Sequence, residues 1–324
     1  MSEILITGGA GFIGSHLTEL LLTCNHSVTI VDDLSTGTPA NLQHLEDHSG
    51  LIFIHGDIGN EELLHEVIQN KDQVYHLAAA VGVALIAKQP IETIERNIYP
   101  TQLLLAALRQ RIEAGETVTT FFSSTSEVYG KNPKETWTEE DDLVFGATTR
   151  PRWSYGVSKA IDEFLALACV KEYNLPIVIG RFFNVVGPRQ TGTYGMVLPR
   201  FVQAALAGEP LQVHDDGKQI RCFSHVYDVT QAITKLMETQ DAFGKVINIG
   251  SDNPISILDL AKRVIEICGS TSNIEFQTYT EAYDESFEDI RRRVPDLTRI
   301  RNMIGDPNKH DIDQIINDVR DSLT

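Results

Sequence analysis

The amino-acid sequence predicts an α/β protein, in which a doubly wound parallel sheet is followed by a smaller C-terminal α/β lobe. Its 324 residues are enough for one large domain or two modest ones. Short apolar runs alternate with segments of helical periodicity as far as residue 182. Such alternation is typical of a parallel sheet that helices cover on both faces. A glycine-rich turn directly follows the first apolar run, at the place where such folds bind nucleotides.

Six apolar runs are expected to form the strands of this sheet. They are residues 3–7, 28–33, 51–57, 73–79, 117–124 and 176–182. Segments with apolar residues at helical spacing connect them. The expected helices are 13–23, 61–70, 91–112 and 153–173. Because helical crossovers join parallel neighbours, these elements together predict a parallel sheet.

The pattern changes after residue 183, where turn residues become frequent. Helices are expected at 197–207, 254–267 and 311–319, and the segment 211–223 predicts a hairpin or an irregular stretch. We therefore expect two units, a Rossmann-type domain that binds the cofactor and a smaller lobe that binds the substrate. Their boundaries are 1–182 with 225–252 for the first unit, and 183–224 with 253–324 for the second.

The chain is acidic, with 45 Asp and Glu against 27 Lys and Arg and a formal net charge of −18. Such a surface repels nucleic acid and anionic lipid, so neither a nucleic-acid nor a membrane partner is expected. An anionic ligand would need a local basic pocket. Widely spaced cysteines, no membrane-length apolar run and no secretion signal predict a cytoplasmic protein. His44 and His48 are interpreted as part of an exposed turn, so no metal is expected.

Three glycines at three-residue spacing follow strand 3–7 and open the next helix. They are Gly8, Gly11 and Gly14. They allow a tight turn and let the backbone approach a pyrophosphate, which the helix N-terminus can bind through unpaired N–H groups. Asp32 ends the second strand, where a carboxylate accepts hydrogen bonds from both ribose hydroxyls and repels a 2′-phosphate. The pattern predicts a fold that binds NAD rather than NADP.

An acid–base centre is predicted on the helix 153–173. Tyr155 and Lys159 are four residues apart and so share one face of this helix. A nearby ammonium stabilises a phenolate and is expected to lower the pKa of the tyrosine. The strand 117–124 leads into hydroxyl and carboxyl groups at the edge of the sheet where ligands bind. These groups belong to Thr125, Ser126 and Glu127.

Six motifs occur in a fixed order over nearly the whole chain. They are TGGAGFIGSH, HLAA, SSTSEVYG, YGVSK, RFFNVVGPR and RRRVPD. In these motifs the chain resembles the extended short-chain dehydrogenase/reductase family of NAD-dependent nucleotide-sugar epimerases, dehydratases and decarboxylases. The resemblance implies that Tyr155 takes the proton of the sugar 4-hydroxyl while NAD⁺ takes the C4 hydride. It also implies that Lys159 holds the nicotinamide ribose and that Thr125 bonds the 4-oxygen.

The resemblance further assigns residues to the two ligands. The additional cofactor residues are Phe12, Ile13, Asp57, Ile58 and Ala78. The residues assigned to the nucleotide sugar are Asn184, Val197, Arg221 and Arg293. Guanidinium groups suit diphosphate oxygens, so Arg221 and Arg293 supply the basic pocket that the acidic surface requires. The resemblance implies a UDP-linked sugar.

Glu127 bears on the reaction that follows oxidation of the sugar. Simple 4-epimerases of the family carry a small or hydroxyl residue there, whereas UDP-glucuronate decarboxylases and 4,6-dehydratases carry an acid. Glucose 4,6-dehydratases add an Asp where this chain has Ser126. The segments PRWSYGVSK and GKQIRCF are most similar to bacterial UDP-glucuronate decarboxylases, which implies that Glu127 and Arg293 position the carboxylate and the protonation step. A UDP-sugar 4-epimerase, a 4,6-dehydratase and an NAD-binding regulatory protein without turnover are the alternatives.

Two departures from the decarboxylase pattern concern the expected pocket. The segment AAAVGVALIAKQP has Leu85 and Ile86 around the position where the decarboxylases carry a tyrosine. Pro100 follows Asn97 in a region where family members carry a glycine. The first departure touches the substrate pocket, and it leaves the epimerase and dehydratase alternatives open.

The two long helices, 91–112 and 153–173, predict an association between subunits. The run Leu103, Leu104, Leu105 and Ala106 is too apolar for a helix surface that faces solvent. The family resemblance implies that these helices form a four-helix bundle between two subunits. We therefore expect a homodimer.

Overall fold

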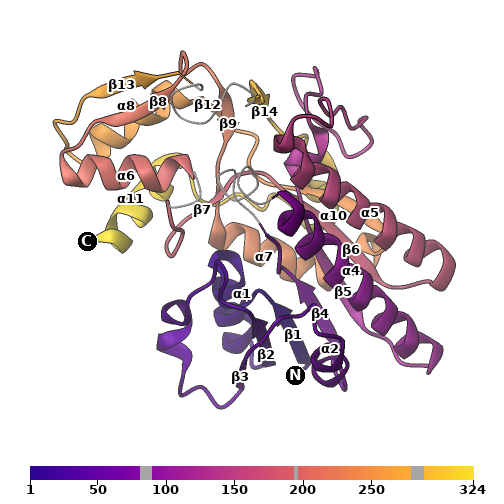
Figure 1. Cartoon of the computed structure of the whole chain (residues 1–324). Helices are drawn as coiled ribbons and strands as arrows, with labels where there is room; N and C mark the ends of the chain where they lie inside the picture. Colours follow the sequence, from indigo (N-terminus) through magenta and orange to yellow (C-terminus); the bar gives the residue numbers. More distant parts are fainter. Residues whose placement is uncertain (81–89, 193–195, 279–287) are drawn as a thin grey trace.

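The computed structural model describes residues 1–80, 90–192, 196–278 and 288–324. Its centre is a seven-stranded parallel sheet in the order β11-β6-β5-β4-β1-β2-β3 (Figure 1). The strands are β1 (Glu3–Thr7), β2 (Ser27–Asp32), β3 (Leu51–His55), β4 (Gln73–His76), β5 (Thr119–Thr125), β6 (Ile177–Phe182) and β11 (Lys245–Ile249). The strand order reverses between β1 and β4, where doubly wound sheets have their ligand crevice. The predicted fold class is confirmed.

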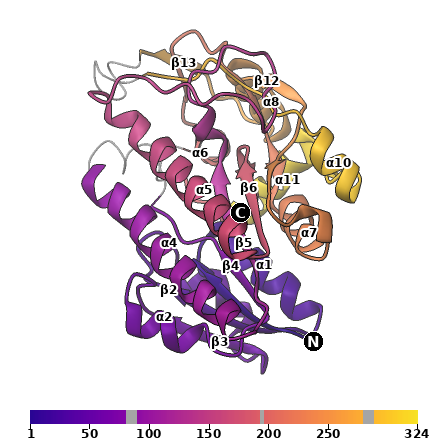
Figure 2. The ribbon, with the colours of Figure 1, turned by 90° about the vertical axis from the view of Figure 1, so that its right-hand side faces the viewer.

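Alternate residues of the strands face opposite sides of the sheet and bury two layers of helices. Ile4 and Ile6 of β1 pack into the first layer, and Leu5 between them packs into the second. The first layer consists of α1 (Phe12–Thr23), α7 (Val226–Met237) and α10 (Thr298–Ile304), and the second of α2 (Glu61–Val67), α4 (Pro90–Glu113) and α5 (Ser154–Tyr173). Figure 2 shows α4 and α5 side by side. Successive side chains that alternate between the two faces, both of them apolar, are what a sheet covered on both faces requires.

A smaller group of elements encloses a separate apolar core. Its helices are α6 (Val197–Ala207), α8 (Ile257–Ile267) and α11 (Ile312–Leu323). Phe201, Leu260 and Ile316 are among the buried side chains that join these helices. The strands β8 (Leu211–His214) and β13 (Ile274–Gln277) pair in parallel beside them. Figure 1 shows this group set apart from the main sheet.

Short strands lie between this group and the main sheet. They are β7 (Val185–Val186), which pairs with β10 (Ser224–His225), and β9 (Ile220–Cys222), which lies between β12 (Pro254–Ser256) and β14 (Arg292–Arg293). The hairpin considered for 211–223 is wrong, because β8 and β9 belong to different sheets. The chain turns between them at Asp215 and Gly217, whose φ angles are 53° and 69°, and β13 occupies the edge of β8.

Several predicted boundaries shift for identifiable reasons. The strands β3 and β4 end earlier than predicted because the residues after His55 and His76 leave the sheet and line a cavity. The helix predicted from residue 254 begins at Ile257, since Ser256 caps it by accepting a hydrogen bond from Asp259 N at 3.0 Å. Helix α7 and strand β11 lie within 225–252. The sequence predicts that this segment returns to the first domain, but it predicts no helix or strand there.

The apolar run on α4 has a different role from the one expected. Leu104 and Leu105 are buried in the core beneath the second layer of helices, so they do not form an outer surface. Leu103 is partly buried, and Ala106 is exposed. Across the described ranges, no helix combines the length and the apolar content that a membrane span requires.

Candidate active site

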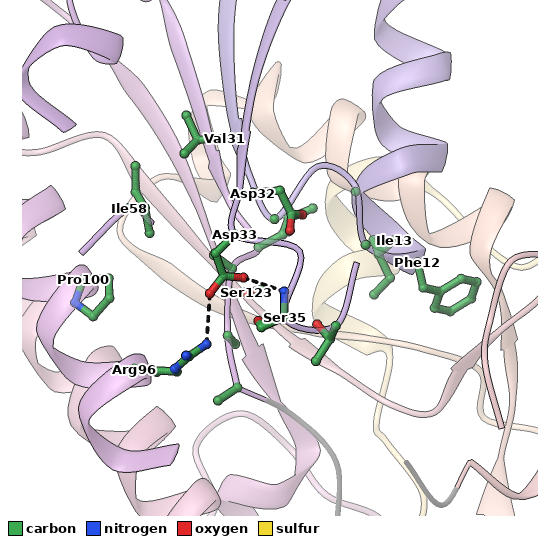
Figure 3. A pocket seen from close by; sticks show the side chains of 18 of the residues that line it. Phe12, Ile13, Val31, Asp32, Asp33, Ser35, Ile58, Arg96, Pro100 and Ser123 are labelled. Carbon is green, nitrogen blue, oxygen red and sulfur yellow. Dashed lines mark hydrogen bonds and ion pairs between the residues drawn. The ribbon is translucent and has the colours of Figure 1, made fainter. Parts of the chain in front are cut away.

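A cavity of about 630 Å³ opens where the central strands end. Its wall includes the segments that follow β1, β2, β3 and β4 (Figure 3). From the predicted cofactor set it brings together Gly8, Gly11, Phe12, Ile13, Gly14, Asp32, Asp57, Ile58, Ala78 and Tyr155. Lys159, predicted with them, is buried and does not line the cavity.

The glycine loop after β1 leaves no room for side chains. A Cβ on Gly8, whose φ is 74°, would stand 2.8 Å from the backbone nitrogen of Ala78, and one on Gly14 would stand 2.2 Å from Gly8 O. Within the described residues, no side chain caps α1 at Gly11. The first N–H groups of the helix are thus available to an anion such as a pyrophosphate.

Asp32 is fixed at the end of β2 by two backbone donors. Its Oδ2 accepts from Ala10 N at 2.9 Å and its Oδ1 accepts from Leu34 N at 2.8 Å. Burial raises the pKa of this carboxyl, and the backbone donors oppose that rise. The side chain faces the cavity beside the glycine loop (Figure 3). A glycine cradle with an adjacent carboxylate fits the pyrophosphate and ribose of a dinucleotide.

An ion pair that the sequence analysis missed lies next to Asp32. Asp33 Oδ2 accepts from Arg96 Nη1 at 2.9 Å, and Asp33 Oδ1 accepts from Ser35 N at 2.9 Å (Figure 3). Asp33 directly follows Asp32, the predicted ribose ligand, and this position in the sequence indicates that Asp33 also lies at the cavity. Arg96 lies on α4, more than sixty residues away in sequence, and nothing in the local pattern indicates that it reaches this cavity.

Tyr155 lies at the start of α5 with 8% of its surface exposed. Burial raises the pKa of its phenol, and the charge of Glu127 acts in the same direction. A hydrogen bond with the Thr125 hydroxyl opposes this rise. The expected lowering by Lys159 is not found, because burial dominates and raises the pKa of Tyr155. The Lys159 ammonium is paired with Asp162 at 2.9 Å. Tyr155 and Thr125 are nevertheless in contact, as the predicted chemistry requires.

Glu127 is held between two arginines. It lies on the short helix η2 (Ser126–Tyr129), and its Oε2 forms an ion pair at 2.5 Å with Arg152 of η3 (Pro151–Trp153). Its Oε1 accepts from Arg293 of β14. Burial works to raise the pKa of Glu127, but the two guanidinium charges hold it at about 2. The predicted pair Glu127 and Arg293 is thus brought together. Arg152 was missed, although it stands in the quoted segment PRWSYGVSK.

Two of the residues assigned to the nucleotide sugar lie side by side on the short strands. Arg221 and Arg293 are paired neighbours on the parallel strands β9 and β14, and Arg221 Nη2 donates to Asp289 Oδ1 at 2.9 Å. Asn184 has a φ of 37° and donates from Nδ2 to Cys222 O at 2.8 Å. Val197 begins α6 and does not line the cavity, although its neighbour Met196 does.

The two departures from the decarboxylase pattern have different outcomes. Leu85 and Ile86 lie outside the described residues. Pro100 lines the cavity from α4. Asn97 on the same helix fixes the chain after β4, since its Oδ1 accepts from Ala80 N at 2.8 Å and its Nδ2 donates to Ser158 Oγ at 3.2 Å. Among the described residues, no three His, Cys, Asp or Glu side chains form a metal-binding group.

Comparison with known proteins gives this geometry its context. Residues 5–319 match the model of the family described as GDP-mannose 4,6 dehydratase. The chain belongs to this family. The resemblance to extended short-chain dehydrogenases/reductases is therefore confirmed, and so is the prediction of an NAD-dependent nucleotide-sugar enzyme at the level of the family.

Three members of this group are similar along most of the chain. A UDP-N-acetyl-alpha-D-glucosaminuronate decarboxylase of Bacillus cytotoxicus is 40% identical over 301 residues, covering 92% of this chain and 90% of the relative. UDP-glucuronic acid decarboxylase 1 of Xenopus tropicalis is 34% identical over 303 residues, covering 94% and 68%. The crystal structure of the UDP-glucuronic acid 4-epimerase of Bacillus cereus, in complex with UDP-glucuronic acid and NAD, has a TM-score of 0.88 at 30% identity, covering 99% and 98%.

Proposed function

We propose that the protein is an NAD-dependent decarboxylase of a UDP-linked hexuronate. The observation that carries the proposal is the pair of arginines, Arg152 and Arg293, that converge on Glu127 next to Tyr155. Two guanidinium groups at one point suit a carboxylate on the substrate. UDP-glucuronate is the substrate predicted from the sequence, and the 40% identical relative adds UDP-N-acetylglucosaminuronate as a second candidate.

The cofactor would be held by the glycine loop and by Asp32, with Asp57, Ile58 and Ala78 on the same cavity wall. When bound, NAD⁺ supplies the acceptor for the C4 hydride. We assign to Tyr155 the removal of the proton from the sugar 4-hydroxyl, and to Thr125 a hydrogen bond to the 4-oxygen. Ser126, whose buried Oγ has no hydrogen-bond partner among the described residues, is left to bind the sugar.

Oxidation at C4 makes the hexuronate a β-keto acid. The bond between C5 and the carboxylate carbon then breaks, CO₂ leaves, and the electron pair passes into the enolate of the 4-keto sugar. A proton from water is added at C5. Hydride return to C4, with return of the proton from Tyr155 to the 4-oxygen, gives a UDP-pentose. Because the pKa of Glu127 is held at about 2, this residue acts in the proposal as a carboxylate that aligns Arg152 and Arg293.

A UDP-hexuronate 4-epimerase is the second candidate. The structural similarity to the Bacillus cereus 4-epimerase favours it. Both reactions share the oxidation step at Tyr155, and they differ in whether the carboxylate stays on the sugar. The arginine pair at Glu127 suits the substrate carboxylate in both reactions, and the 40% identical decarboxylase relative favours decarboxylation.

Mass spectrometry distinguishes these reactions. The purified protein is incubated with NAD⁺ and either UDP-glucuronate or UDP-N-acetylglucosaminuronate, with the Tyr155→Phe variant as the control. A product lighter by the mass of CO₂, absent from the control, is the expected result. An unchanged mass with a changed chromatographic retention would establish the epimerase instead. No change in either substrate would contradict both candidates.

We also propose a cytoplasmic homodimer formed through α4 and α5. Two patches of exposed apolar side chains support it, with Ile91 72% exposed and Phe164 69% exposed. On α5 the exposed residues Val157, Ile161 and Phe164 follow the spacing of a single helix face. Burying this face against a second copy would cover apolar surface on the two helices that lie side by side in Figure 2.

The division into two functional units is part of the same proposal. Residues 1–182 with 225–252 would bind the cofactor, and 183–224 with 253–324 would bind the nucleotide sugar. The parallel pairing of β11 with β6 supports the return of 225–252 to the first unit. The shared core of α6, α8 and α11 supports the second unit. Within 253–324, α10 packs instead against the main sheet.

A further inference from the structure

Helix α5 carries a buried acid that the reaction described above does not use. Tyr155, Lys159 and Asp162 follow the spacing of one helix face. Lys159 Nζ donates to Asp162 Oδ2 at 2.9 Å, with side chains that are only 2% and 4% exposed. The lysine that the family resemblance assigns to the cofactor ribose is therefore held by a carboxylate of its own helix.

The neighbouring acid, Glu163, serves a different purpose. Arg181 binds both of its oxygens, with Nε to Oε1 at 2.9 Å and Nη2 to Oε2 at 2.7 Å. Asp162 has no such anchor, since its Oδ1 makes no hydrogen bond with any described residue. The Thr101 hydroxyl lies beside this carboxyl, but it donates its hydrogen to Asn97 O at 2.9 Å. Lys159 is thus the cation to which Asp162 is fixed.

The other titratable groups around Lys159 and Asp162 are either neutral or paired with a partner of opposite charge. His76 of β4 faces Lys159, and burial together with the lysine charge lowers the pKa of His76 to about 3, so the imidazole is neutral. Glu163 is neutralised by Arg181. On the side of Tyr155, Glu127 is matched by Arg152 and Arg293. Among the charges on its own helix, that of Asp162 acts on Tyr155, and Lys159 is the cation paired with Asp162.

We propose that Asp162 is a positioning residue of the redox centre, which fixes the Lys159 ammonium and offsets its charge on the helix face that carries Tyr155. The inference rests on the role given to Tyr155 in the proposed function. Asp162 acts through the lysine and touches no reacting atom in this scheme. The charge of Asp162 contributes to raising the pKa of Tyr155. Removal of this charge would leave the Lys159 ammonium uncompensated on the same helix face, and the tyrosine would then lose its proton at a lower pH.

Titration of Tyr155 tests this without any substrate. Tyrosinate absorbance is followed against pH in the NAD-loaded protein, and the signal of the Tyr155→Phe variant is subtracted. The same difference is measured in the Asp162→Asn background, where the midpoint is expected to fall by about one pH unit. The acidic limb of the kcat/KM profile should move by the same amount. Asp162→Glu, which keeps the charge, should leave the midpoint close to the wild-type value.

Glu172→Gln is the matched control, because this exposed acid lies on the same helix about 25 Å along its axis from Tyr155. An Asp162→Asn midpoint equal to that of Glu172→Gln would overturn the proposal, as would an equal shift in Asp162→Glu. If Asp162→Asn fails to fold, the Tyr155 midpoint of Asp162→Ala is compared with that of Glu172→Gln instead. If both variants fail to fold, the proposal is overturned, because Asp162 then has a structural role only. Failure of the proposed function looks different: the midpoint moves as expected, but neither UDP-hexuronate loses CO₂.

Discussion

Arg293 and Glu127 form an ion pair although 166 residues separate them in the chain. Glu127 follows the central strand β5, whereas Arg293 belongs to the short strand β14, close to the C-terminus. Arg152 binds the other carboxylate oxygen, so the acid joins three distant segments. The same contact connects the main sheet to the short strands, and in the proposed function it marks where the substrate carboxylate binds.

The Glu127 ion pairs are expected to make stability depend on pH. The pKa of this carboxyl is about 2 in the folded protein, against an ordinary value of 4.5. A lowered pKa stabilises the fold at pH values above 4.5, and this stabilisation is lost as the pH falls towards 2. The Glu127→Gln variant should therefore have a lower Tm at pH 7. Its free energy of unfolding should be smaller by about 3 kcal/mol.

Thermal unfolding of both proteins between pH 7 and pH 3 checks this expectation. The difference in Tm should be largest at pH 7 and should shrink below pH 4.5 as the wild-type carboxylate is protonated. A difference that stays constant over this range would show that Glu127 contributes through packing and not through its charge.

Tyr155→Phe should reduce turnover by about 10²–10⁴-fold, because it removes the proposed proton acceptor. The phenyl ring preserves the packing of a side chain that is almost fully buried, so the NAD content and the affinity for the nucleotide sugar should stay near wild-type values. Steady-state rates and the amount of NAD that copurifies would be measured together. Retention of more than roughly a tenth of the wild-type rate would contradict the assignment of the acid–base role.

Asp32→Ala should weaken NAD binding about tenfold or more, because a charged acceptor for the ribose hydroxyls is lost. Binding of NADP should fall less, since the carboxylate no longer repels a 2′-phosphate. Titration calorimetry with each dinucleotide gives the ratio of the two affinities. Asp47→Ala is the matched control, as Asp47 is exposed and lies outside the cavity wall. An unchanged ratio in Asp32→Ala would contradict the ribose assignment.

Phe164→Glu should separate the proposed homodimer into monomers at micromolar concentration. The side chain is 69% exposed on α5, and a charge buried against a second copy without a partner would oppose association. Sedimentation velocity compares this variant with Leu323→Glu, which makes the same kind of change at a side chain 41% exposed on α11. A monomeric wild-type protein would rule out the dimer, and a dimeric Phe164→Glu would place the interface elsewhere.

The sequence predicts the main sheet well because strands that are buried on both faces form continuous apolar runs. The strands β1, β5 and β6 were located in this way to within two residues at each end. The short strands β9, β12 and β14 carry no such signal, since two or three residues are too few to show a period. Their pairing is decided by which distant segments meet.

The same distinction applies to the site. The glycine loop, Tyr155 and Lys159 could be predicted because spacing along one element fixes their relation. The ion pairs of Arg152 with Glu127 and of Arg96 with Asp33 could not, because they depend on how separate elements pack. Asp162 is an intermediate case, since its spacing of three residues from Lys159 is visible in the sequence.

The two proposed ligand sites are completed at different times during synthesis. Among the described residues, all that line the proposed cofactor cavity precede residue 197, whereas Arg221 and Arg293 are translated later. A ribosome adds about 5–20 residues per second, so the interval between residues 197 and 293 lasts about 5–20 s. During it the nascent chain already contains the cofactor wall, while Glu127 still lacks one of its two arginines. A prematurely terminated chain would therefore carry a nucleotide cradle next to an incompletely neutralised acid.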